Sequence, residues 1–120
     1  MTADQIDDLR QQVGWERFGK YDQALARSYT HFIVRHESLL IGFLNVISDG
    51  VANAFLVDLL ILPAFQKKGI GKALIKQAVA ELTSDGIQCI QVTFSEELEE
   101  FYKKCGFYIF KAGIIDNKAS

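Results

Sequence analysis

The stretch at residues 52–82 reads ANAFLVDLLILPAFQKKGIGKALIKQAVAEL and decides the fold. Residues 52–62 are almost all apolar, which is typical of a strand in the middle of a sheet. From Leu74 to Leu82 the period changes, because apolar residues recur there at helical spacing. The loop between this predicted strand and helix contains Gly69 and Gly71. The stretch therefore predicts a strand, a glycine-containing loop and a helix in direct succession.

Sequence patterns in the rest of the chain predict further helices and strands before and after this strand–loop–helix unit. They are helices at 3–12 and 20–29, strands at 29–35 and 39–48, a strand at 87–94, a helix from Ser95 to about Cys105, and a strand at 107–111. Gly42 marks a bulge in the second strand, and Ser95 is expected to cap the last helix. A strand meander followed by a strand–helix–strand crossover predicts an α/β fold. We expect one domain, 1–120, with a mixed, mostly antiparallel sheet flanked by helices.

The glycine loop has the composition of an anion site. Gly69 and Gly71 stand at a predicted helix N-terminus, where free backbone N–H groups and the positive end of the helix dipole suit a pyrophosphate. No acid occurs from Leu59 through Ala80, whereas four lysines do. In a chain with a net charge of −2, this is a local positive patch.

Two familiar phosphate motifs are excluded by their spacing. A Walker A loop would need glycine at Gln66 and serine or threonine at Ala73. A dinucleotide fingerprint would need glycine or alanine at Leu74. The alternative that remains open is that the two glycines only shape a tight turn.

Two segments, in the right order, resemble the signatures of one family. Gln66-x-x-Gly69-x-Gly71, followed by Lys-Ala-Leu, is similar to motif A of the GNAT (GCN5-related) N-acetyltransferases. The segment Glu100–Phe107 (EFYKKCGF) is similar to their closing signature, Leu-Tyr-x-x-x-Gly-Phe. The resemblance covers about residues 30–110. A weaker likeness, carried by Val13-Gly14-Trp15, Ser48-Asp49-Gly50 and Asp58, is to the subgroup with plant serotonin N-acetyltransferases.

The resemblance implies that acetyl-coenzyme A is the acetyl donor and that no metal takes part. Backbone N–H groups from Lys67 to Ala73 would hold the pyrophosphate, and Leu60–Leu62 would pair with the pantetheine arm like an added strand. Ser95 stands where the family often has an asparagine that touches the arm. The implied cofactor-binding residues are Leu60, Ile61, Leu62, Gln66, Lys67, Lys68, Gly69, Ile70, Gly71, Lys72, Ala73, Ser95 and Phe101.

Two residues are the candidates for catalysis. Tyr102 stands at the family's general-acid position, and its phenol is un-ionised at neutral pH, with a reference pKa of about 10. Asp58 is the only charged residue in 52–62 and could accept the proton of the amine or hold the ammonium group. Each has a structural alternative. Tyr102 could belong only to an apolar helix stripe, and Asp58 could be the partner of a buried Arg35 or of a lysine.

The acceptor is expected to be a primary amine of a small molecule, and an arylalkylamine is one candidate. Trp15, Phe18 and Tyr21 could line its pocket or could instead form a packing stripe between helix and sheet. Two other functions remain open. One is a coenzyme A binding regulatory module without turnover, and the other is acetylation of protein N-termini or lysines.

The composition and the first residues of the sequence lead to expectations about partners, location and oligomeric state. The net charge of −2 gives no reason to expect nucleic acid or a membrane surface as a partner. A long apolar run and a signal peptide are both lacking, so the cytoplasm is the expected location. The family's usual first strand is missing before the first helix. Either the sequence is short at its N-terminus, or a partner chain covers that sheet edge, in which case we expect a homodimer.

Overall fold

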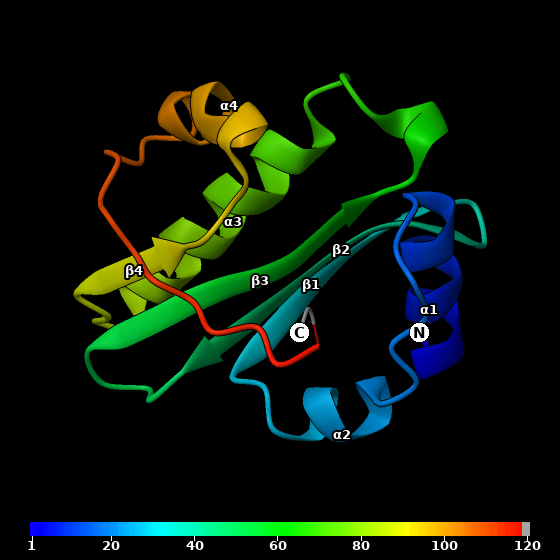
Figure 1. Cartoon of the computed structure of the whole chain (residues 1–120), viewed down its shortest axis with the longest axis horizontal. Helices are drawn as coiled ribbons and strands as arrows, with labels where there is room; N and C mark the ends of the chain where they lie inside the picture. The colour runs from blue at the N-terminus through cyan, green and yellow to red at the C-terminus, as the bar shows by residue number, and fades with distance from the viewer. Residues whose placement is uncertain (119–120) are drawn as a thin grey trace.

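The computed structural model describes residues 1–118, whose helices surround one sheet. The elements are α1 (Ala3–Gln12), α2 (Tyr21–Ala26), β1 (Thr30–His36), β2 (Leu39–Ser48), β3 (Asn53–Ile61), the 3-10 helix η1 (Pro63–Phe65), α3 (Ile70–Ser84), β4 (Cys89–Val92), the 3-10 helix η2 (Glu96–Leu98) and α4 (Glu99–Lys104). Within residues 1–118 the strand order is β1-β2-β3-β4 (Figure 1). The first three strands are antiparallel and β4 is parallel to β3, which confirms the mixed, mostly antiparallel sheet.

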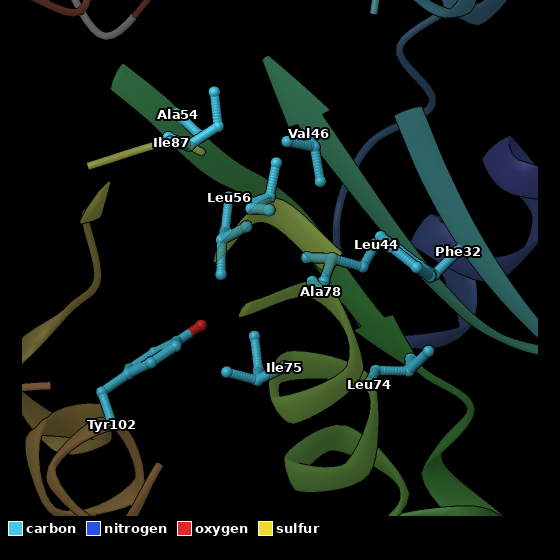
Figure 2. Close-up of a cluster of buried hydrophobic side chains, with 11 residues drawn as sticks. Phe32, Leu44, Val46, Ala54, Leu56, Leu74, Ile75, Ala78, Ile87 and Tyr102 are labelled. Carbon is cyan, nitrogen blue, oxygen red and sulfur yellow. The ribbon is translucent and has the colours of Figure 1, made fainter. Parts of the chain in front are cut away.

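The two faces of the sheet are covered by different helices. On one face, alternate residues of β2 and β3 pack against the apolar side of α3 (Figure 2). The central members of this cluster are Leu44, Val46, Ala54, Leu56, Ile75, Ala78 and Leu82. The other face packs against α1 and α2 through Leu40, Phe43, Leu60, Ile6, Leu9 and Tyr21. The sheet is therefore the middle layer between two hydrophobic clusters.

A β-bulge in each of two strands shifts the side-chain alternation. In β2 the extra residue is Ile41, directly before Gly42, which confirms the bulge expected there. In β3, Val57 pairs with Asn45 and Leu60 pairs with Phe43. Between these two pairs β3 has two residues, Asp58 and Leu59, whereas β2 has one, so β3 carries an extra residue next to Asp58. Asp58 has a positive φ of 57°, which is uncommon for a residue other than glycine.

Three local expectations were wrong or too long. The second helix is limited to Tyr21–Ala26 and the fourth strand to Cys89–Val92. Ser95 does not cap the last helix through its side chain, since its hydroxyl donates to Glu97 Oε1 at 2.7 Å. A 3-10 turn follows Ser95, and α4 begins only at Glu99.

The strand expected at 107–111 does not form. Gly106, with φ of 103°, ends α4, and the following segment (orange to red in Figure 1) runs back toward α2. Tyr108 and Phe110 are more than 80% exposed. A run of β-forming side chains specifies a strand only where another strand edge accepts its hydrogen bonds, and within residues 1–118 no such pairing occurs. No helix in this range is both long enough and apolar enough to cross a membrane.

The loop between α1 and α2 is fixed by a buried carboxylate. Asp7 in α1 is only 3% exposed. Its two oxygens accept the backbone N–H groups of Phe18 at 2.7 Å and Gly19 at 3.0 Å. Thr2 begins α1 with a capping box shared with Gln5. These contacts hold the 13–19 loop against the body of the protein.

We expect Asp7→Ala to lower the free energy of unfolding by about 2–3 kcal/mol, because two backbone N–H groups would lose a charged acceptor. Urea denaturation followed by circular dichroism measures this change. Asp8→Ala is the matched control, because Asp8 forms only an exposed ion pair with Arg17. Equal effects of the two substitutions would show that Asp7 does not anchor the loop.

Candidate active site

A cavity of about 700 Å³ lies between the α1–α2 loop, the second half of β3, the η1–α3 loop and α4. From β3 and the α1–α2 loop, its walls include Leu59, Ile61, Val13 and Trp15. From the loop before α3 and its first turn come Phe65, Gln66, Lys67, Gly69, Gly71 and Lys72. From α4 and the residue before it come Leu98, Phe101, Tyr102 and Lys104. Its size is typical of a small-molecule site.

The cavity opens where β3 and β4 part. Their parallel pairing runs from Asn53 opposite Cys89 to Leu56 opposite Val92 and goes no further. Beyond Leu56, β3 continues to Ile61 with its outer edge unpaired by β4. An extended ligand can add to such an edge as another strand does.

The two positions in the loop require glycine for different physical reasons. Gly69 caps α3 with φ of 83°, a backbone conformation that only glycine adopts without strain. Gly71 needs no special φ, but a Cβ there would lie 3.5 Å from Phe101 Cζ and 3.7 Å from Ile61 Cγ1. Any larger side chain at Gly71 would therefore project between two walls of the cavity. Next to them, Gln66 ties the loop to β3 by donating from Nε2 to the Ile61 carbonyl at 2.9 Å.

The charge of the cavity is positive. Lys67, Lys72 and Lys104 line it, and the N-terminus of α3 adds the positive end of a helix dipole. Neither Asp nor Glu occurs among its described lining residues. The first N–H groups of α3 have no acceptor within the helix. This end of the cavity is suited to a phosphate-bearing ligand.

Tyr102 is the ionisable group buried most deeply in the cavity wall. It is 5% exposed, and Figure 2 shows its hydroxyl pointing from α4 toward the cluster of Ile75 and Leu56. Its ring stacks on Phe94 with a centroid distance of 4.7 Å and meets Phe107 edge-on. Burial, with a smaller contribution from Cys105, raises the pKa of Tyr102 to about 12. The phenol is therefore a proton donor at any pH near neutrality.

Asp58 is paired with a residue that the sequence did not suggest. Its Oδ1 lies 3.6 Å from Arg10 Nη1, so the partner is Arg10 of α1 and not Arg35 or a lysine. Arg10 in turn donates to Tyr21 Oη at 3.1 Å. Burial raises the pKa of Asp58 above its usual value, while Arg10 and a hydrogen bond from Tyr21 oppose that shift. The carboxylate lies directly before Leu59 but does not itself line the cavity.

The structure divides the residues expected to bind the cofactor into two groups. Those that line the cavity are Ile61, Gln66, Lys67, Gly69, Gly71, Lys72 and Phe101. Leu60 and Leu62 instead belong to the cluster under α1, and Lys68, Ile70, Ala73 and Ser95 lie outside the described lining.

Sequence reasoning missed five residues of the wall: Val13, Leu59, Phe65, Leu98 and Lys104. Of the three aromatic candidates, only Trp15 lines the cavity, because Tyr21 is buried in the core and Phe18 packs edge-on against it.

Comparisons with known proteins identify the family. Residues 27–109 match the family model described as "Acetyltransferase (GNAT) domain". Histone acetyltransferase TAP1 of Glycine max is 33% identical over 91% of this chain and 53% of its own length. The uncharacterized N-acetyltransferase ycf52 of Gracilaria tenuistipitata var. liui is 31% identical over 91% of this chain and 63% of its own.

The chain thus spans between about half and two thirds of the length of these relatives. A GNAT family acetyltransferase structure from Streptococcus pneumoniae TIGR4 superposes with a TM-score of 0.80 at 26% identity, covering 98% of this chain and 92% of that one. By sequence and by fold, the chain belongs to the GNAT acetyltransferase family.

Proposed function

We propose that this chain is an acetyl-coenzyme A dependent N-acetyltransferase that acetylates the primary amine of a small aromatic molecule. One observation carries the proposal. A single cavity joins an open strand edge, a positively charged helix N-terminus and the un-ionised phenol of Tyr102. These parts are needed to hold an extended thioester with a pyrophosphate and to protonate the thiolate that departs when the acetyl group is transferred.

The donor would be held mainly by backbone and lysines. The N–H groups between Lys67 and Ala73 would bind the pyrophosphate, with Lys72 and Lys104 supplying positive charge. The unpaired edge of β3 near Ile61 would pair with the pantetheine arm. A backbone N–H on that edge would polarise the thioester carbonyl for direct attack by the amine. Leu60, Leu62 and Ser95 would contribute through backbone or from outside the cavity wall.

The acceptor class follows from the walls of the cavity. Because no described lining residue is acidic, the cavity offers no counter-charge to a polycationic acceptor. Trp15, Leu59 and Leu98 offer apolar surface suited to an aromatic ring. An arylalkylamine with one amino group matches both features.

Two alternatives are distinguished by an acceptor panel. Acetylation of protein lysines is one alternative function, because one relative is named a histone acetyltransferase. A coenzyme A binding module without turnover would bind the cofactor and acetylate nothing. Thiol release measured with phenethylamine, a lysine-rich peptide and a peptide with a free N-terminus separates the three. Location in the cytoplasm and formation of a homodimer stay predictions.

We expect acetyl-coenzyme A at about a hundred times its dissociation constant to raise the free energy of unfolding by roughly 2.7 kcal/mol. Gly71→Val should remove this gain, because its side chain would occupy the space between Phe101 and Ile61. Thermal-shift titration measures both proteins, and melting without ligand checks that the variant folds. The wild-type protein showing no shift would contradict the proposed function itself.

Tyr102→Phe should lower kcat by about 100- to 10,000-fold, the usual worth of a positioned acid, because it removes only the proton donor. The phenyl ring keeps the stack on Phe94, so the melting temperature and the affinity for acetyl-coenzyme A should change little. Steady-state thiol release and calorimetry measure these quantities. Near-normal turnover of the variant would leave Tyr102 as a packing residue only.

Asp58→Asn separates a catalytic from a structural role for this carboxylate. Because its folded-state pKa is raised, Asp58 contributes stability that is present below its unfolded pKa and lost as pH rises through the folded pKa. Urea denaturation should therefore show the asparagine variant gaining stability relative to wild type as pH rises through the acid range.

Turnover of the same variant tests catalysis. If Asp58 accepts the proton of the amine or holds the ammonium group, the loss of turnover should shrink at alkaline pH, where free amine accumulates. Normal turnover across the pH range would assign Asp58 to structure alone.

A further inference from the structure

Arg10, near the C-terminal end of α1, contacts four groups that belong to different parts of the fold. Its side chain is 16% exposed. Its guanidinium carbon lies 4.9 Å from the ring centroid of Trp15, and its Nε donates to the Glu16 carbonyl at 2.8 Å. Its Nη1 donates to Tyr21 Oη at 3.1 Å and lies 3.6 Å from Asp58 Oδ1. The guanidinium thus bridges the α1–α2 loop and β3.

The contacts of Arg10 lie directly behind two walls of the cavity. Trp15 is 48% exposed and lines the cavity from the α1–α2 loop. Asp58 is followed directly by Leu59, which lines the cavity from β3. Asp7 anchors the loop further along, at Phe18 and Gly19. At Trp15 itself the side-chain contacts come from Arg10, whose guanidinium lies over the face of the indole and donates to the carbonyl of the next residue.

We propose that Arg10 is a positioning residue that sets the affinity for the acceptor amine by holding the indole of Trp15 as the acceptor-side wall of the cavity. The inference rests on the proposed acetyl transfer to an aromatic amine. The planar guanidinium stacks on one part of the indole and leaves about half of the side chain exposed, where an aromatic acceptor can contact it. Immobilising that wall before binding reduces the entropy lost when the acceptor binds.

The alternative is that Arg10 only neutralises the partly buried Asp58. A lysine would supply the same charge, but it has neither a planar face for the indole nor the Nε–H that reaches the Glu16 carbonyl. Arg10→Lys therefore separates the two roles. Arg10→Met removes the charge as well, and Arg27→Met, at an exposed arginine just after α2, is the matched control.

The first measurement uses acetyl-coenzyme A as donor and phenethylamine as acceptor. For Arg10→Lys we expect the acceptor KM to rise about tenfold, with kcat and the dissociation constant of acetyl-coenzyme A each within a factor of about two. Arg10→Met should show at least the same rise in KM together with a lower melting temperature, because Asp58 loses its charged partner. Arg27→Met should match the wild-type protein in all three quantities.

The second measurement does not depend on turnover. Trp15 is the only tryptophan of the chain, so indole fluorescence reports on this wall alone. Acrylamide should quench Trp15 more strongly in Arg10→Lys than in the wild-type protein or in Arg27→Met. Phenethylamine, titrated with coenzyme A present so that no acetyl group can be transferred, should change the wild-type fluorescence saturably and bind about tenfold more weakly to Arg10→Lys.

The outcomes separate this inference from the proposed function. Wild-type quenching and wild-type phenethylamine affinity in Arg10→Lys would overturn the inference and leave Arg10 as a charge partner of Asp58. No saturable response to phenethylamine in the wild-type protein would overturn it as well. If phenethylamine binds but is never acetylated, the proposed acetyl transfer fails, and the role of Arg10 in binding the amine is still decided by the titration.

Discussion

The extra residue in β3 next to Asp58 decides where every later side chain of that strand points. Before it, Ala54 and Leu56 face α3. A strand without the bulge would place Leu60 on the same face and would direct Leu59 and Ile61 toward α1. With the bulge, Leu60 enters the cluster under α1, and Leu59 and Ile61 line the cavity. One inserted residue thus gives the same strand a packed first half and a ligand-facing second half.

The bulge requires a backbone conformation that its residue does not favour. Asp58 adopts φ of 57°, and such strain costs on the order of 1–3 kcal/mol for a residue other than glycine. Aspartate tolerates the left-handed region better than most residues do. Its carboxylate is also partly buried, which raises its pKa, and Arg10 and Tyr21 stabilise the charged form. The conformation therefore persists because α1 and α2 supply partners for the side chain.

Much of the fold could be predicted because local patterns determine it. The period change after Leu62 predicted the strand, the loop and the helix, and the family signatures pointed to the glycine loop and Tyr102, which both line the cavity. The bulge in β3 gave no such signal, since a continuous apolar run has no alternation from which a register shift can be read. Asp58 was the only charged residue to interrupt this apolar run at 52–62. Because the bulge was not evident from the sequence, neither the place of Leu59 in the cavity wall nor the packing of the Leu60 side chain under α1 was predicted.

The other errors have tertiary causes. Arg10 lies in a helix whose apolar stripe is clear, but its partner is set by how α1 packs across β3. The 3-10 turn after Ser95 delays α4, so Leu98 and Lys104 line the cavity in place of Ser95. Residues 107–111 carry β-forming side chains and lack a strand partner within residues 1–118. For Arg10 the deciding contact comes from an element distant in sequence, and for residues 107–111 such a contact is lacking within residues 1–118.

The proposed donor and acceptor sites would be linked by the same short segment of β3. The unpaired edge that would receive the pantetheine arm begins after Leu56, and the ion pair that anchors the acceptor wall is made two residues later, at Asp58. If Arg10 left Asp58, a partly buried carboxylate would lose its charged partner, and the strained φ of Asp58 would lose its compensation. Trp15 would lose its contact with the guanidinium in the same event. In the proposed function, one guanidinium would therefore support both the acceptor wall and the strand that pairs with the donor.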